Sequence, residues 1–173
     1  MPVVLVANPK GGVGKSTLAT NIAGYFASRG HAVMLGDIDR QQSSRLWLGL
    51  RTPRAREIRT WEASDDGNVV RPPRGTTHAV IDTPAGLHGS RFKDVVAVAD
   101  KVLVPLQPSI FDIYATRDFL DKLLAHRHAG KTQIGVIGMR VDARTLAADR
   151  LREIVDGLGV PVLGGVRDTQ DYV

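Results

Sequence analysis

The stretch KGGVGKST, residues 10–17, decides the fold of this chain of 173 residues. It follows the apolar run PVVLVA at residues 2–7 and leads into a helix-length stretch that begins at Ser16 and that Gly30 ends. Its glycines let the backbone turn tightly with the N–H groups pointing inward, and the N-terminus of the following helix adds a partial positive charge. The stretch therefore predicts a strand, a phosphate-binding loop and a helix, in this order.

Each residue of this loop has an expected part in binding a polyphosphate. Lys15 supplies a mobile cation that can reach the β- and γ-phosphate oxygens. The Ser16 hydroxyl is placed to ligate Mg²⁺, and Thr17 is placed to contact the α-phosphate. The backbone cradle is formed by Gly11, Gly12, Val13 and Gly14. The alternative is a glycine-rich turn with two exposed lysines, which the strand–loop–helix setting disfavours.

The rest of the chain alternates short apolar runs with amphipathic stretches. Further strands are expected at 31–36, 78–82, 101–105, 133–139 and 161–165, and helices at about 43–49, 90–98, from a capping Asp112 to about His126, and 143–157. Residues 51–75 are the least regular part. The alternation predicts an α/β fold of the P-loop NTPase type, a mostly parallel twisted sheet with helices on both faces. We expect one domain, residues 1–173, that could lack its C-terminal helix.

Composition narrows the classes of function. The chain is 43% apolar and 24% charged, as globular proteins are. It has no cysteine, which excludes disulfides, thiolate zinc sites, iron–sulfur clusters and thiol nucleophiles. No apolar run approaches the ~18–20 residues of a membrane span, so a cytoplasmic location and no membrane partner are expected. The net charge of +5 favours an acidic partner but fits ordinary solubility equally well.

The loop departs from the strict phosphate-loop pattern in one informative way. Pro9 stands at the first glycine position, and an additional lysine, Lys10, follows it. In this the loop resembles the deviant Walker A motif, KGGxGK[ST], of the ParA/MinD family of ATPases. The resemblance implies that ATP is the nucleotide and that two subunits sandwich it. It also implies that Lys10 reaches across this homodimer to the partner's ATP.

The stretch GDIDRQQSS, residues 36–44, resembles the DxDPQ switch of the same family, with Arg40 in place of the proline. The resemblance implies that Asp39 positions the attacking water and that Asp37 belongs to the magnesium shell. The alternative is that both carboxylates simply cap the turn that follows the strand.

AVIDTPAG, residues 79–86, resembles the Walker B strand and its switch, which implies that Asp82 holds Mg²⁺ through water. Two other stretches, VPLQPSIFD at 104–112 and QSSRLWLGLR at 42–51, resemble segments of the small, DNA-segregating ParA proteins. For these two, strand termination and plain helix packing remain open as alternatives.

Recognition of the base has a weaker signature. GMRVD, residues 138–142, places Met139 where the family has a polar reader of adenine, which leaves Arg140 as the nearest polar group. The segment that follows the last strand occupies the position from which the family closes over the base, and this implies contacts from Val166, Arg167 and Asp168.

The resemblance implies a slow, partner-stimulated ATPase that dimerises with ATP, binds DNA without sequence preference and drives the partition or positioning of a plasmid, chromosome or protein cargo. It also implies a partner protein that stimulates hydrolysis and links the cargo, and association with the nucleoid. Six arginines between 51 and 74 could contact DNA phosphates or simply be solvated. Two alternatives stay open: a MinD-like membrane-associated positioning ATPase, and a P-loop metabolic ligase, for whose substrate pocket 173 residues leave little room.

Overall fold

The sheet places seven parallel strands side by side in the order β3-β2-β6-β1-β7-β8-β9. The computed structural model describes residues 1–62, 64–65, 68–69, 71–126, 129–141, 153, 157 and 159–169. The strands of the sheet are β1 (Val3–Val6), β2 (Val33–Asp37), β3 (Ile58–Thr60), β6 (His78–Asp82), β7 (Lys101–Leu106), β8 (Gln133–Met139) and β9 (Val162–Val166). The predicted α/β class with a mostly parallel sheet is confirmed.

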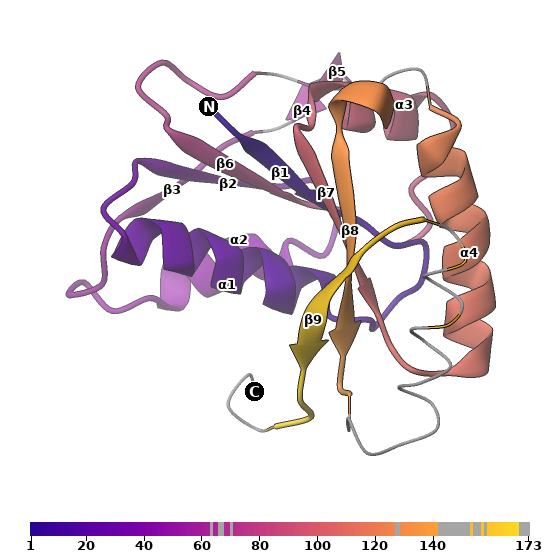
Figure 1. Ribbon diagram of the computed structural model, residues 1–173. Helices are drawn as coiled ribbons and strands as arrows, with labels where there is room; N and C mark the ends of the chain where they lie inside the picture. The colour runs from indigo at the N-terminus through magenta and orange to yellow at the C-terminus, as the bar shows by residue number, and fades with distance from the viewer. Residues whose placement is uncertain are drawn as a thin grey trace.

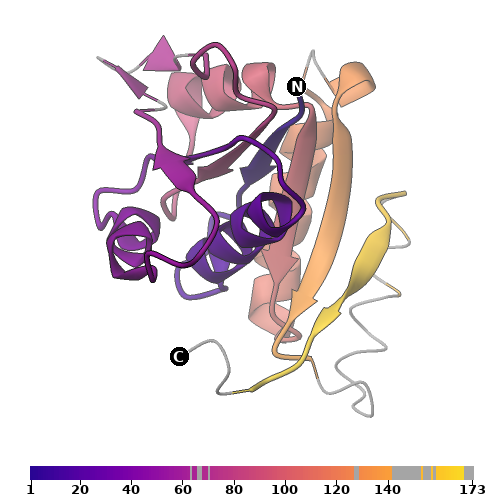
Figure 2. The same cartoon turned by 90° about the vertical axis from the view of Figure 1, so that its left-hand side faces the viewer.

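Helices cover both faces of this sheet (Figures 1 and 2). One face carries α1 (Lys15–Ser28) and α2 (Ser43–Leu50), and the other carries α3 (Gly89–Val98) and α4 (Ile110–Leu124). A 3₁₀ turn, η1 (Ala129–Lys131), precedes β8, and β4 (Ser64–Asp65) pairs antiparallel with β5 (Asn68–Val69) apart from the main sheet. No described helix combines the length and apolar character that crossing a membrane requires.

Successive side chains of the central strands belong alternately to two hydrophobic cores, one on each face of the sheet. Leu5 and Ile81 pack with the residues of α3 and α4, whereas Val6 and Val80 pack with α1. All four side chains are fully buried. Because successive side chains of a strand point to opposite faces, a strand covered on both faces is apolar throughout. This explains why β1 and β6 are continuous apolar runs in the sequence.

Helix ends follow local sequence signals, with one correction. Gly30 ends α1 as predicted: it has a φ of 85°, and its N–H donates to the Ala27 carbonyl oxygen at 2.9 Å. The prediction that Asp112 caps α4 is wrong. Ser109 is the capping residue, its carbonyl oxygen accepts the Ile113 N–H at 2.9 Å, and Asp112 lies within the first turn. The Ser109 side chain makes no capping bond, whereas the Asp112 carboxylate in the first turn interacts favourably with the helix dipole.

The stretch 51–75, read from the sequence as irregular, contains one strand of the main sheet. β3 lies at the edge and pairs in parallel with β2, with Leu35 opposite Thr60. It has three residues, of which only Ile58 is buried, so no alternation could reveal it. The helix expected at 143–157 lies outside the described residues apart from Glu153 and Gly157.

The chain order of the strands creates a crevice. β1 lies between β6 and β7. After β1 the chain forms β2, β3 and β6 on one side of it, and then β7, β8 and β9 on the other side. In open parallel sheets, ligands bind beyond the carboxyl ends of the strands at such a point. The loops after β1, β2, β6 and β7 converge there.

Candidate functional site

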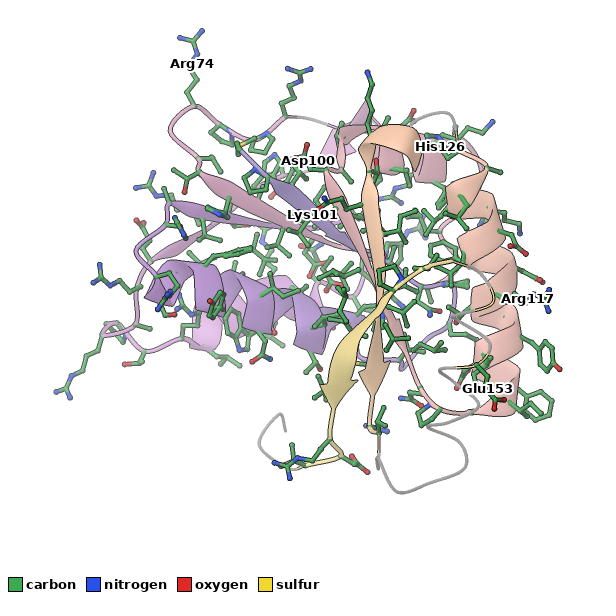
Figure 3. The ribbon with its side chains drawn as sticks, viewed as in Figure 1. Arg74, Asp100, Lys101, Arg117, His126 and Glu153 are labelled. Carbon is green, nitrogen blue, oxygen red and sulfur yellow. The ribbon has the colours of Figure 1, made fainter. Side chains whose placement is uncertain are left out.

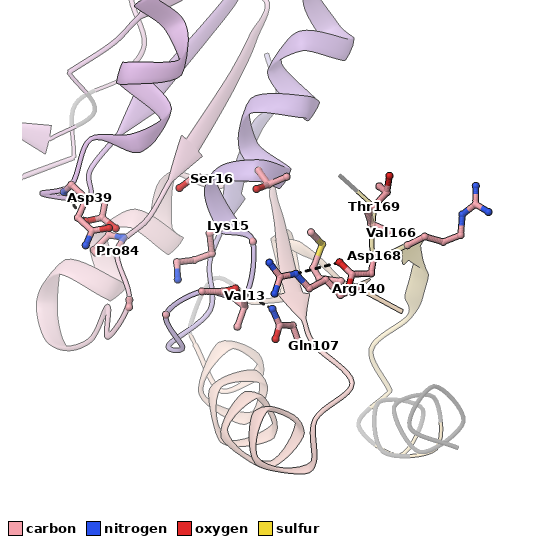
Figure 4. Close-up of a pocket in the computed structure, with 18 residues that line it drawn as sticks. Val13, Lys15, Ser16, Asp39, Pro84, Gln107, Arg140, Val166, Asp168 and Thr169 are labelled. Atoms are coloured by element: carbon pink, nitrogen blue, oxygen red, sulfur yellow. Dashed lines mark hydrogen bonds and ion pairs between the residues drawn. The ribbon is translucent and has the colours of Figure 1, made fainter. Parts of the chain in front are cut away.

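A cavity of about 870 Å³ lies beyond the carboxyl ends of the strands (Figure 4). Its lining comes from the carboxyl ends of β1, β2, β6, β7, β8 and β9 and from the segments that follow them. The lining consists of Gly11, Gly12, Val13, Gly14, Lys15, Ser16, Thr17, Asp39, Gln41, Pro84, Ala85, Gln107, Met139, Arg140, Val166, Arg167, Asp168 and Thr169. The structure thus brings residues 11–17 of the expected phosphate loop together with Asp39 and with the residues expected at the base.

Two glycines of the loop have backbone conformations that other residues adopt poorly. Gly12 has a φ of 73° and Gly14 a φ of 90°. Gly14 also lies against Met139: a Cβ at position 14 would stand 2.8 Å from the Met139 Cε. The Gly14 carbonyl oxygen accepts the Leu18 N–H at 2.9 Å, which starts α1. The loop therefore turns sharply into the helix N-terminus, as a phosphate cradle requires.

Two polar side chains that sequence reasoning missed hold this loop in place. Asn8 is buried, and its Nδ2 donates to the Pro105 carbonyl oxygen at 2.8 Å while its Oδ1 accepts the Lys10 N–H at 2.8 Å. Gln107 Nε2 donates to the Gly12 carbonyl oxygen at 3.0 Å. A polar asparagine directly after an apolar run was the available signal for the first of these anchors.

Lys15 lies inside the site. Its side chain is only 7% exposed, and its Nζ donates to the Lys10 carbonyl oxygen at 2.6 Å. Burial lowers the pKa of Lys15, and the charges of Asp82 and Asp39 oppose that shift. The Lys15 ammonium group therefore lies in the phosphate loop, where the charges of Asp39 and Asp82 act on it.

Asp82 is fully buried at the end of β6. Its Oδ2 accepts a hydrogen bond from Ser44 Oγ at 2.6 Å, whereas its Oδ1 is buried and accepts none from the described part of the chain. Burial raises the pKa of the Asp82 carboxyl, the hydrogen bond from Ser44 and the nearby Ser16 side chain lower it, and the charge of Asp37 raises it further.

This arrangement fits a magnesium ion. The Oδ1 of Asp82, which has no partner in the described chain, is a hard oxygen ligand, and the Ser16 side chain is among the groups that lower the pKa of the same carboxyl. No group of three or more histidine, cysteine, aspartate or glutamate residues suited to a metal occurs among the described residues. Few protein ligands are what Mg²⁺ needs, because it keeps several waters and takes phosphate oxygens.

The two carboxylates after β2 differ in their contacts. Asp37 Oδ2 accepts the N–H groups of Ser44 at 2.8 Å and Arg45 at 3.2 Å, and its Oδ1 accepts the Asp39 N–H at 3.0 Å. Asp37 therefore caps the turn, which is the alternative raised from the sequence. Asp39 lines the cavity, and its Oδ1 accepts the Gln41 N–H at 3.0 Å. Their parts in the magnesium shell and in hydrolysis stay predictions.

Lys10 does not belong to the lining of this cavity. Its Nζ lies 3.5 Å from Asp112 Oδ1, and its side chain is 42% exposed. The expected reach to a second subunit stays a prediction.

The residues expected at the base lie on the other side of the phosphate loop from Asp39 and Pro84 (Figure 4). Arg140 Nε pairs with Asp168 Oδ1 at 3.7 Å, and Val166 and Arg167 lie beside them in the lining. The cavity thus extends from the end of β2 to the end of β9. A contact of these residues with adenine stays a prediction.

Comparison with known proteins agrees with this geometry. The profile of the family described as the CobQ/CobB/MinD/ParA nucleotide binding domain matches residues 4–173. The maintenance of carboxysome distribution protein A of Gloeobacter kilaueensis is 31% identical over 151 residues, which cover 83% of this chain. The match spans 65% of that relative's length.

Solved structures share the fold. The MinD cell division protein of Aquifex aeolicus superposes with a TM-score of 0.75 at 21% identity, covering 98% of this chain and 83% of that chain. Cobyrinic acid a,c-diamide synthase of Mycobacterium smegmatis, solved with ADP and magnesium, gives a TM-score of 0.76 at 21% identity, covering 99% of this chain and 89% of that chain. At these identities the likeness concerns the fold alone.

Proposed function

This chain belongs to the CobQ/CobB/MinD/ParA nucleotide-binding domain family, and from that premise we propose that it is an ATP-driven switch that positions a cargo on DNA. It binds Mg²⁺ and ATP, dimerises around the nucleotide, and hydrolyses ATP slowly to ADP and phosphate. The observation that carries this proposal is a cavity lined by a sharply turned phosphate loop with a buried Lys15. The charge of the fully buried Asp82 acts on that lysine, and Asp82 Oδ1 has no hydrogen-bond partner in the described chain.

The site is suited to phosphoryl transfer by positioning and charge. The inward N–H groups of the loop and the N-terminus of α1 hold the phosphates, and Lys15 neutralises their charge. Ser16 and Asp82 hold the magnesium ion, which supplies further neutralisation at the phosphate oxygens. Asp39 positions the attacking water from the turn after β2. Residues 37–44 and 82–90, which follow neighbouring strands, report the nucleotide state.

The dimer depends on Lys10. A side chain that is part exposed and tied to Asp112 by one ion pair of 3.5 Å is free to exchange that partner at small cost. We place it on the ATP of the partner subunit. Assembly then requires the triphosphate, and hydrolysis releases the dimer.

A second cavity supports the DNA-binding part of the proposal. It measures about 360 Å³ and lies at the amino ends of β2, β3 and β6, away from the nucleotide site. Arg56, Arg59 and Arg74 line it, and Glu57, the acid in its described lining, pairs with Arg59 at 3.1 Å. Arg74 points away from the body of the protein (Figure 3). DNA phosphates held here would not compete with a dimer formed over the nucleotide.

The part of the proposal that concerns the cargo rests on the name of a relative and not on contacts in the site. The name of the Gloeobacter kilaueensis relative, which concerns carboxysome distribution, supports a role in spacing a protein cargo. We propose a cytoplasmic protein that associates with the nucleoid and a partner that stimulates hydrolysis and links the cargo. Pelleting with liposomes tests the MinD-like alternative of a membrane partner.

Three variants test the nucleotide switch by light scattering with Mg-ATP or Mg-ADP and by phosphate release. Lys15→Ala weakens nucleotide binding by about 100-fold, because it removes a charge-assisted contact worth about 3 kcal/mol. Asp39→Ala is expected to dimerise with ATP but to release no phosphate.

Lys10→Ala is expected to bind ATP as a monomer and no longer to dimerise.

Lys93→Ala is the matched control, because Lys93 is an exposed lysine of α3 outside the cavity lining. It should dimerise and turn over like the wild type. ATP-dependent dimers of normal stability in the Lys10→Ala variant would contradict the role of Lys10 across the interface.

A further inference from the structure

Ser44 makes a hydrogen bond to Asp82 that the sequence motifs of the site do not predict. Its side chain is fully buried in the first turn of α2, and its Oγ donates to Asp82 Oδ2 at 2.6 Å. The two residues are 38 positions apart in the chain. A short hydrogen bond between a hydroxyl and a carboxylate is among the stronger kinds in proteins.

The position of Ser44 is itself fixed by the other carboxylate. The Ser44 N–H donates to Asp37 Oδ2 at 2.8 Å. Asp37 and Asp82 are direct partners in the parallel pairing of β2 and β6. One serine therefore bridges two neighbouring acids, through its backbone N–H on one side and its hydroxyl on the other.

The bridge leaves Asp82 with one committed oxygen and one available oxygen. Oδ2 is taken by Ser44, and Oδ1 is buried without a hydrogen-bond partner in the described chain. A carboxylate held at one oxygen cannot rotate freely, so its other oxygen stays in one place. Metal ligands in proteins are commonly oriented by such a hydrogen bond to a neighbour.

The same bridge fixes the turn that carries Asp39. The Asp39 N–H donates to Asp37 Oδ1 at 3.0 Å, and the Asp39 carbonyl oxygen accepts from the N–H and the Nε2 of Gln42 at 3.1 and 2.8 Å. Asp37 thus holds both Asp39 and Ser44. A shift of Ser44 away from Asp82 would move the turn relative to β6.

We propose that Ser44 is a positioning residue that presents Asp82 Oδ1 to the magnesium ion and holds the Asp39 turn in register with it. This inference rests on the proposed function, because it concerns the magnesium and nucleotide site of that proposal. Loss of such an orienting partner commonly weakens metal binding by about 10- to 100-fold. We expect about 10-fold for Ser44, since Asp82 keeps its place at the end of β6.

The test uses a fluorescent ADP analogue, titrated with the full chain in EDTA and then with increasing Mg²⁺. Ser44→Ala removes a single oxygen and leaves a residue that favours helix, so the fold is kept. We expect the analogue to bind this variant in EDTA as it binds the wild type, and the half-saturating Mg²⁺ concentration to rise about 10-fold. Ser44→Thr, which keeps the hydroxyl, should restore it.

Ser43→Ala is the control, since Ser43 is the exposed neighbour in the same helical turn. Equal magnesium requirements in Ser44→Ala and Ser43→Ala would overturn the inference. So would an equal loss of binding with and without Mg²⁺, because that result marks a general structural defect. If Ser44→Ala does not fold, Ser44→Cys, a weaker donor of similar size, is judged by the same two criteria.

The outcome for the wild type separates the two levels of the proposal. If its nucleotide affinity rises with Mg²⁺ and Ser44→Ala behaves identically, only the role of Ser44 fails. If the wild type does not bind the nucleotide, or binds it without regard to Mg²⁺, the proposed function fails and this inference fails with it.

Discussion

Asp82 and Lys15 are the charged side chains that the described part of the protein buries. Burial raises the pKa of the acid and lowers the pKa of the base, so both shifts reflect a cost of desolvating charge. Native proteins keep such costs mainly where a ligand or a reaction uses the charge. A triphosphate with Mg²⁺ is a ligand that would use both groups.

The pKa shift of Asp82 predicts how stability depends on pH. Its ordinary value is 3.8 and the folded value is higher, so above pH 3.8 the folded state binds more protons than the unfolded state. The wild type therefore loses stability relative to Asp82→Asn as pH rises from 3.8 through the folded pKa, and this deficit persists at pH 7. Urea unfolding in EDTA measures it; a stability difference that does not change between acid and neutral pH would rule it out.

At the scale of elements, α2 depends on Asp37 more than on its own capping residue. Gln42 at the N-cap has a φ of 52° and makes no capping bond to the helix N-terminus with its side chain. Asp37 supplies the acceptors instead, because its Oδ2 takes the N–H groups of Ser44 and Arg45. The carboxylate also interacts favourably with the helix dipole.

Asp37→Asn should therefore destabilise the protein by about 1 kcal/mol, the usual value of a lost helix cap. The amide can accept with only one of its two positions, so one set of N–H groups is left without a partner. The midpoint of urea unfolding measures the change. Arg40→Ala, at an exposed position of the same turn, is the control and should leave the midpoint unchanged; a smaller loss in Asp37→Asn than in Arg40→Ala would disprove the capping role.

At the scale of the whole molecule, the two cavities lie at opposite ends of the strands. The nucleotide cavity follows the carboxyl ends, and the arginine-lined cavity lies at the amino ends of β2, β3 and β6. In the dimer that we propose over the first cavity, the second cavity would stay exposed on each subunit. In that proposal, ATP strengthens DNA binding by joining two weak sites.

Replacing Arg56, Arg59 and Arg74 by alanine together should weaken DNA binding and flatten its salt dependence. Each lost phosphate contact lowers the slope of log K against log salt by about 0.9. ATP-dependent dimerisation should be unchanged. The control removes three exposed cations from α3 and α4, Lys93, Arg117 and Lys122. If both triple variants lose the same affinity, net charge and not the cavity would account for binding.

The sequence by itself determined the α/β class, the parallel sheet and the place of the phosphate loop. Short apolar runs, helical patterns and the end signal at Gly30 involve only a few neighbouring residues, so they can be recognised without the fold. The order of motifs along the chain then brought Lys15, Asp39 and the 166–168 segment to one edge of the sheet.

Only the tertiary structure decided which partner each polar group takes. In the structure Asp37 caps the start of α2, Ser44 donates to Asp82, and Lys10 pairs with Asp112. The short strand β3 also pairs at the edge of the sheet. Apart from the Asp37 contact, which spans 7 residues, these contacts join residues far apart in the chain. They depend on how the helices pack on the sheet, and no local pattern encodes that packing.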